Sequence, residues 1–301
     1  MSDDPIRITG LTKRFRWTPV LKGLELAVPR GAVFALIGPN GAGKTTTIKI
    51  LMNILRATSG RAEILGMDSR RLAGRDFTRI GYVSENQEMP DWMTVDYFMA
   101  YLRPFYPAWD SELAAQLVRQ FNLPGARKLK HLSRGMRMKA ALASSLAYRP
   151  EVVMLDEPFT GLDPLARDEF IEGLLERSEN TTVFISSHDL ADIETFASHI
   201  AYLDNGRIQF SEELSALSDR FREMEITFDA APPLPEDWPA TWLRPESSAA
   251  VIRFTESRYD AERTMAEIRQ RFPDARNVSA TPVPLRSIFV TVAKAAQSVA
   301  A

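Results

Sequence analysis

The sequence predicts an α/β domain that contains an inserted helical subdomain and is followed by a small α+β domain. Up to about residue 210, short strand-like runs alternate with helical patterns. From Thr94 to Tyr148 the strand-like runs disappear and helical periodicity takes over. Beyond Phe221 the composition shifts and includes the proline-rich stretch APPLPEDWP. We therefore expect a first domain over residues 1–215, with the helical subdomain at about 90–148, and a second domain over residues 222–301.

The strands expected in the first domain are IRITGL, GLELAV, VFALIG, RAEILG, IGYV, EVVMLD, TVFISS, HIAYLD and RIQF. Val33 to Ile37 and Val152 to Leu155 are apolar without alternation, which is typical of parallel strands covered on both faces. Asp204-Asn205-Gly206 between two such runs predicts a tight hairpin. The helix after the first apolar strand is expected to carry one apolar face made of Ile48, Leu51, Met52 and Leu55.

Helix signals mark the inserted subdomain and the second domain. Ser111 is the expected N-cap of a helix whose apolar stripe comprises Ala114, Leu117, Val118 and Phe121. In the second domain, MEITF, VIRF and Asn277 to Ala280 predict strands. Two helices are expected there, one with Met265, Ile268 and Phe272, the other with Leu285, Ile288, Phe289 and Val292.

Composition limits the classes of partner. The 37 basic and 39 acidic residues leave a net charge of -2, without the basic excess that binding to a phosphate backbone usually requires, so nucleic acid is not expected as the main partner. Because there is no cysteine, disulfides and thiolate metal sites are excluded. No apolar run approaches the ~20 residues that span a bilayer, and the start MSDDPIRITG has no signal-like character, so we expect a cytoplasmic protein.

A glycine-rich phosphate loop, GPNGAGKTT, lies between the strand VFALI and the helix that follows. Strand, loop and helix in this order form the context that the motif GxxxxGK[ST] requires. The glycines let backbone N–H groups point at phosphate, Lys44 is expected to reach the β- and γ-phosphates, and the Thr45 hydroxyl is expected to bind Mg²⁺. The nucleotide contacts expected from this loop are Gly38, Asn40, Gly41, Gly43, Lys44, Thr45 and Thr46.

Acidic and basic side chains follow two further apolar strands. Asp156 ends the strand in EVVMLDEP and is placed to hold Mg²⁺, since hard cations prefer oxygen ligands. Glu157, the next residue, can take a proton from an attacking water. His188 follows the strand TVFISS, where its ring could contact a γ-phosphate or orient Glu157. With the phosphate loop upstream, we assign catalysis to Lys44, Glu157 and His188.

The alanine-rich stretch HLSRGMRMKAALASSLAYR predicts a helix that begins at a serine and a glycine. Ser133 is a natural N-cap, and Gly135 removes a side chain where unpaired N–H groups and the positive end of the helix dipole point outward. Such an end can bind an anion, but an isolated serine and glycine would more simply cap a buried helix unless the rest of the chain supplies the anion.

Taken together, GPNGAGKTT, LSRGM, VVMLDEP, TGLDP and the histidine of SSHDL resemble, in this order, the ATP-binding subunit of a bacterial exporter-type ATP-binding cassette (ABC) transporter. The resemblance covers roughly residues 5–210 and implies the P-loop fold of the ABC nucleotide-binding domain, with ATP and Mg²⁺ as cofactors. It further implies a head-to-tail dimer in which the signature helix, with Ser133 and Gly135, faces the γ-phosphate of ATP bound to the other subunit.

The resemblance also assigns roles to single residues. Asp163 in TGLDP matches the residue that communicates across the dimer, and His188 matches the switch histidine. Phe15 matches the aromatic residue that stacks on adenine, with Trp17 as a nearby substitute, although either could belong to the core.

Three positions depart from the family pattern. The usual LSGGQ is replaced by a sequence with Arg134 and Met136, so the helix end survives but a side-chain amide is lost. Where a glutamine commonly follows the strand IGYV, Glu85 stands, with Gln87 two residues on, and either could take the role. Since a glutamate can coordinate Mg²⁺, the expected metal-site residues are Thr45, Asp156 and Glu85.

The resemblance implies a motor at the cytoplasmic face of the membrane that hydrolyses ATP and drives an integral membrane subunit encoded separately. The cluster of Met89, Pro90, Trp92 and Met93 lies where the family receives a cytoplasmic helix of that subunit, or it packs the subdomain only. The alternatives are cassette ATPases that act on DNA or the ribosome. The former carry long coiled-coil insertions and the latter usually two cassettes, and neither feature is present in this sequence.

Overall fold

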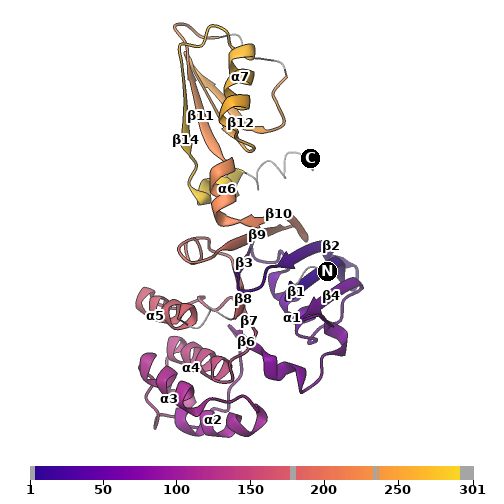
Figure 1. Cartoon of the computed structure of the whole chain (residues 1–301), viewed down its shortest axis with the longest axis vertical. Helices are drawn as coiled ribbons and strands as arrows, with labels where there is room; N and C mark the ends of the chain where they lie inside the picture. The colour runs from indigo at the N-terminus through magenta and orange to yellow at the C-terminus, as the bar shows by residue number, and fades with distance from the viewer. Residues whose placement is uncertain (1–3, 177–180, 233–234, 236, 292–301) are drawn as a thin grey trace. The chain divides into compact units, whose positions relative to one another are not determined.

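The computed structural model describes residues 4–176, 181–232, 235 and 237–291. The chain divides into two compact units, Met1–Ser211 and Glu212–Ala301, which we describe separately (Figure 1). Within the described residues, no helix has both the length and the apolar character needed to cross a membrane.

A six-stranded sheet with the order β10-β9-β3-β8-β7-β6 forms the centre of the first unit. Its strands are β3 (Val33–Ile37), β6 (Ile80–Ser84), β7 (Val152–Asp156), β8 (Thr182–Ser187), β9 (His199–Asp204) and β10 (Arg207–Glu213). Neighbouring strands from β6 to β9 pair in parallel, and every residue of β3, β7 and β8 is buried. The prediction of parallel strands covered on both faces is therefore confirmed.

The predicted hairpin at residues 204–206 is also confirmed. Asn205 and Gly206 both have positive φ angles, 47° and 75°, as a type I′ turn requires, and they join the neighbouring strands β9 and β10.

A second sheet, with the order β2-β1-β4-β5, shares one core with the central sheet and helix α1. It is antiparallel, with the elements β1 (Ile6–Phe15), β2 (Thr18–Val28), β4 (Ser59–Ile64), β5 (Met67–Asp68) and helix α1 (Lys44–Leu51). The expected extension of α1 through Leu55 is wrong, because the chain leaves the helix at Met52 and Asn53 adopts a left-handed φ of 55°. Leu55 still packs against the same core from outside the helix.

Three helices, α2, α3 and α4, build the inserted subdomain and gather at one end of the first unit (Figure 1). Their bounds are Val95–Leu102, Ser111–Gln120 and Arg134–Leu146, and α5 (Pro164–Leu175) follows β7. The expected cap at Ser111 is wrong by one residue, because the Asp110 carboxylate accepts the N–H of Leu113 and Ser111 is the first helical residue. A carboxylate at this position stabilises both the free N–H groups and the helix dipole.

The second unit is a four-stranded antiparallel sheet with the order β12-β13-β11-β14, packed against helix α7. Its elements are α6 (Leu214–Arg220), β11 (Arg222–Thr227), β12 (Trp242–Ser248), β13 (Val251–Glu256), α7 (Ala261–Arg271), β14 (Asn277–Pro282) and a helical segment at 285–291. The strand β12 was not predicted, because WLRPESS is polar and contains a proline, as an edge strand can. Val292, expected on the last helix, lies outside the described residues.

Candidate functional site

The phosphate loop connects β3 to α1, and its conformation depends on glycine. Gly41 and Gly43 have φ angles of 82° and 115°, which side-chain-bearing residues rarely adopt. A Cβ atom added to Gly38 would lie 2.1 Å from the carbonyl oxygen of Leu203, so that position admits no side chain without a backbone shift. The loop leaves the first N–H groups of α1 free of side-chain caps, as a phosphate-binding helix end requires.

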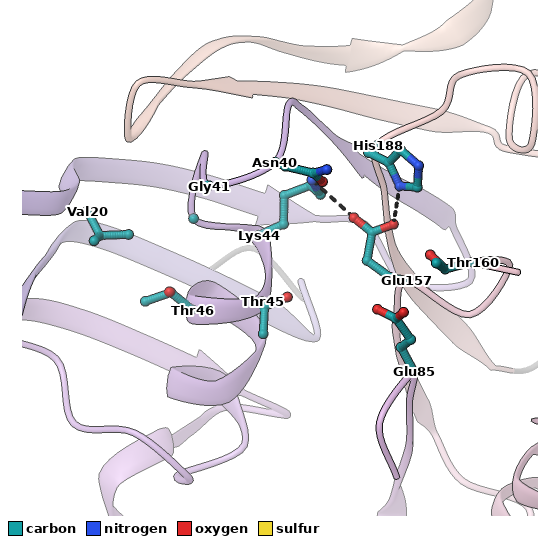
Figure 2. Close-up of a pocket in the computed structure, with 11 residues that line it drawn as sticks. Val20, Asn40, Gly41, Lys44, Thr45, Thr46, Glu85, Glu157, Thr160 and His188 are labelled. Carbon is teal, nitrogen blue, oxygen red and sulfur yellow. Dashed lines mark hydrogen bonds and ion pairs between the residues drawn. The ribbon is translucent and has the colours of Figure 1, made fainter.

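A cavity of about 540 Å³ opens at this loop and collects residues from five separate segments, one of which is β2 with Val20 (Figure 2). Besides the loop itself, it is lined by Glu85 after β6, Glu157 and Thr160 after β7, and His188 after β8. These strands are parallel and neighbouring, so their carboxyl ends meet at one edge of the sheet, where ligands bind in open α/β folds.

Lys44 is held inside the cavity by three oxygen atoms. Its ammonium group donates to the carbonyls of Gly38 at 2.7 Å and Pro39 at 3.2 Å, and lies 3.1 Å from Oε1 of Glu157. The Lys44 side chain is only 5% exposed, so its charge is directed into the cavity and has few competing water contacts. This is a cation poised for an anionic ligand of the loop.

Thr45 and Asp156 form the second contact of the site. The Thr45 hydroxyl donates to Oδ1 of Asp156 at 2.9 Å, and the Ser186 hydroxyl donates to the same oxygen at 2.8 Å. Burial raises the pKa of Asp156, while the hydrogen bonds from Ser186 and Thr45 oppose that rise. The two hydroxyls therefore stabilise the ionised form of Asp156, which burial disfavours.

Glu157 and His188 form the third contact. Oε2 of Glu157 lies 2.7 Å from Nδ1 of His188, and Figure 2 shows both side chains together at one edge of the cavity. Glu157 has a left-handed φ of 50°, and its N–H donates to the Ser186 hydroxyl at 3.0 Å. A non-glycine residue in this conformation carries backbone strain, which persists where the surrounding contacts enforce it.

Six predicted site residues do not line this cavity, namely Phe15, Gly38, Ser133, Gly135, Asp156 and Asp163. Ser133 caps α4 by accepting the N–H of Met136, and Asp163 caps α5 by accepting the N–H of Ala166. Both caps are exposed. Phe15 is 46% exposed, and its ring contacts the ammonium group of Lys13.

The structure distinguishes between Glu85 and Gln87. Glu85 lines the cavity, whereas the amide oxygen of Gln87 turns back to accept the N–H of Ser84 at 3.4 Å. The carboxylate of Glu85 also accepts a hydrogen bond from Arg134 at 2.6 Å.

Among the residues of the proposed docking cluster, Met89 and Met93 are buried and pack the subdomain, as the alternative interpretation holds. Trp92 is 63% exposed, and its ring lies 5.7 Å from that of Tyr97.

Sequence reasoning missed three contributors to the site. Val20 and Thr160 line the cavity, and the Ser186 hydroxyl donates to Asp156 at the end of β7 and accepts the backbone N–H of Glu157. Ser186 carried a signal, since it is one of three hydroxyl residues in the strand TVFISS, and a hydroxyl has to find a partner when it is buried.

Comparison with known proteins identifies the family. Residues 21–160 match the family model described as ABC transporter. The daunorubicin resistance ATP-binding protein DrrA3 of Streptomyces coeruleorubidus is 35% identical over 215 residues, which cover 69% of this chain and 68% of that protein. The chain belongs to the ABC transporter family. It is an ATP-binding subunit of this family and an ATPase, which confirms the expected fold, function and enzyme class.

Other relatives support the assignment over different lengths. The daunorubicin/doxorubicin resistance ATP-binding protein DrrA of Streptomyces peucetius is 29% identical over 304 residues, covering 95% of this chain and 92% of that protein. The uncharacterized ABC transporter ATP-binding protein sll0415 of Synechocystis is 37% identical, and the match spans 65% of this chain but only 57% of that relative. A solved structure titled as the ATP-binding subunit of an ABC transporter is similar with a TM-score of 0.65 and 26% identity, over 71% of this chain and 92% of that one.

Proposed function

We propose that the subunit binds ATP with Mg²⁺ in the cavity at the phosphate loop, hydrolyses it in a head-to-tail pair of chains, and drives a separate membrane subunit. The observation that carries this proposal is the convergence on one cavity of Lys44, Thr45, Glu157 and His188, with Asp156 bonded to Thr45. These groups supply a phosphate-binding cation, oxygen donors and a base within one site.

The residues of the chain divide the chemical work. When a triphosphate enters, Lys44 exchanges Glu157 and the loop carbonyls for phosphate oxygens, and the free N–H groups of the loop bind the same anion. Glu157, released from Lys44, accepts a proton from the water that attacks the γ-phosphate, while His188 holds its other oxygen. The side chain of Phe15, which is exposed at the end of β1, stacks on the adenine.

The donor set fits Mg²⁺. No group of three or more His, Cys, Asp or Glu side chains suited to a metal occurs in the described part of the chain. A hydroxyl and a buried carboxylate side by side instead match a cation that takes its other ligands from phosphate and water. Thr45 and Asp156 would hold it, with Glu85 at the cavity wall, and the ion would offset charge that develops on the phosphate oxygens.

A second copy completes the site in this proposal. The capped start of α4, with Ser133 and Gly135, is accessible but is not part of the cavity of its own chain, and neither is Asp163. In a head-to-tail pair each α4 start would face the γ-phosphate bound by the other chain. One solved structure with the same fold is titled as a dimeric post-hydrolysis state of an ATP-binding cassette bound to ADP and Pi.

A membrane subunit is the proposed receiver of the motion. One similar structure is titled as part of the ABC transporter complex cbiONQ. Trp92, exposed on the subdomain beside Tyr97, offers an apolar surface for a helix of such a partner at the cytoplasmic face of the membrane.

A photocrosslinking residue at position 92 tests the partner. We expect it to capture a polytopic membrane protein in cells, whereas the same residue at position 54 should not, because Ile54 is similarly exposed, at 58% against 63%, but lies outside the subdomain. Capture of ribosomal protein or DNA from position 92 would replace the transporter proposal with one of the nucleic-acid alternatives.

A further inference from the structure

Glu85 forms an ion pair with Arg134 at the edge of the nucleotide cavity. Nη2 of Arg134 lies 2.6 Å from Oε1 of Glu85, and the side chains are 47% and 30% exposed. The partners come from different elements, since Glu85 follows β6 and Arg134 is the first residue of α4. Figure 2 shows the Glu85 carboxylate below that of Glu157 on the same side of the cavity.

The charge of the cavity makes this pair consequential. Among the lining residues that the structure describes, the carboxylates are Glu85 and Glu157, whereas Lys44 is the only permanent cation. Asp156, which accepts a hydrogen bond from the Thr45 hydroxyl, adds another acidic group next to the cavity. A triphosphate brings several further negative charges, so an uncompensated carboxylate at position 85 would repel the ligand.

Glu85 and Arg134 are also two of the positions at which the sequence departs from the family pattern. The pattern has a neutral glutamine at the first and a neutral glycine at the second, and this chain replaces them with opposite charges that contact each other. We propose that Arg134 is a positioning residue that neutralises Glu85 and holds its carboxylate at the cavity wall. The negative charge introduced at position 85 is then balanced by the positive charge introduced at position 134. This inference rests on the proposed function of the cavity.

The surroundings of Arg134 favour a role within its own chain. A Cβ on Gly161 would lie 3.0 Å from Nη1 of Arg134, so the guanidinium packs closely on the loop between β7 and α5. Arg134 therefore links the segment after β6, the start of α4 and the loop that carries Asp163. One turn later, Arg137 pairs with Asp91 at 2.9 Å, but neither of these residues lines the nucleotide cavity.

A double-mutant cycle tests the proposal. Affinity for a fluorescent, non-hydrolysable ATP analogue in the presence of Mg²⁺ is measured in the full chain, together with ATP turnover. Arg134→Gln, which keeps a helix-forming residue, should weaken analogue binding about three- to tenfold by exposing the charge of Glu85. Glu85→Gln in the same chain should restore the affinity to within about twofold of the wild type, and Arg134→Lys should retain most of it because the charge is kept.

The Arg137–Asp91 pair is the matched control. The cycle made from Arg137→Gln and Asp91→Asn should show no coupling in nucleotide affinity, since neither residue lines the nucleotide cavity. Because the proposed effect occurs within one chain, it should not depend on protein concentration.

Two results would overturn the inference. If Arg134→Gln stayed equally defective in the Glu85→Gln background, Arg134 would act on the nucleotide itself. If Arg134→Gln bound the analogue as the wild type does, the ion pair would have no part in binding. Failure of the wild-type chain to bind the analogue would instead refute the proposed function.

Discussion

Replacing Glu157 by glutamine should separate nucleotide binding from hydrolysis. Glutamine keeps the shape and the hydrogen bond to His188 but cannot accept the proton of the attacking water, so turnover should fall by about two to four orders of magnitude. The substitution should not change the backbone strain at position 157. Glutamate and glutamine are both non-glycine residues, and either has to adopt the left-handed φ of 50°.

The same substitution should tighten ATP binding. Oε1 of Glu157 lies 3.1 Å from Nζ of Lys44, and at this distance the Coulomb attraction is about 1 kcal/mol in water and about 5 kcal/mol at an effective dielectric constant of 20. ATP has to displace Glu157 from Lys44, so part of this attraction opposes binding. We expect the loss of the charge to lower the Kd about three- to tenfold, which corresponds to roughly 0.7–1.4 kcal/mol.

Phosphate release and titration with a fluorescent ATP analogue measure the two effects. Glu151→Gln is the matched control, because Glu151 is an ion-paired carboxylate at the opposite end of β7, 2.5 Å from Arg79. Near-normal turnover of the Glu157→Gln variant would remove Glu157 from the mechanism. Unchanged affinity would refute the competition between Glu157 and ATP for Lys44.

Three further substitutions test separate parts of the account. Burial raises the pKa of Asp156, so the folded protein holds this proton more readily than the unfolded chain, and the free energy of unfolding falls as pH rises through the interval between the two pKa values. Asp156→Asn should remove this slope and raise the Tm at neutral pH while weakening Mg²⁺-dependent binding; a lower Tm in thermal scans would contradict the assignment. Gly38→Ala should cost about 1–3 kcal/mol in denaturant unfolding, whereas Gly74→Ala, which meets no atom within 4 Å, should be neutral, and equal stabilities would show that the loop tolerates the Cβ. Gln87→Ala should change ATP affinity less than twofold, because its amide turns back to Ser84, and a larger loss would return the role to Gln87.

Local patterns predicted the parts of the structure that depend on neighbouring residues. The phosphate loop was predictable because its glycines stand between an apolar strand and a helix, and the carboxyl ends of such strands meet at one edge. The exact start of α3 and the exact end of α1 were harder to predict, because neighbouring residues favour different boundaries. Asp110 and Ser111 are adjacent capping residues, and the carboxylate takes the cap. Helix α1 ends at Leu51, shortly before Asn53 with its left-handed φ, although apolar residues continue the helical spacing.

Contacts between distant segments lay beyond such patterns. The pairs Lys44–Glu157 and Glu85–Arg134 join residues from separate elements, and no spacing rule relates them. The strand β12 was missed because an edge strand is half solvated and needs no apolar alternation. The departures at Glu85 and Arg134 were visible one by one in the sequence, but only the fold brings them within 2.6 Å of each other.

Mixing two inactive variants tests most directly whether each ATP lies between two chains. Lys44→Ala disables the phosphate loop, and Ser133→Asp keeps a good helix cap while placing a negative charge toward the phosphate, with the neutral cap Ser133→Asn as its control. Each variant alone should lack turnover. A head-to-tail pair of unlike chains contains one intact site, so an equal mixture should recover about a quarter of the wild-type specific activity. A mixture no more active than its separate components would contradict the shared site.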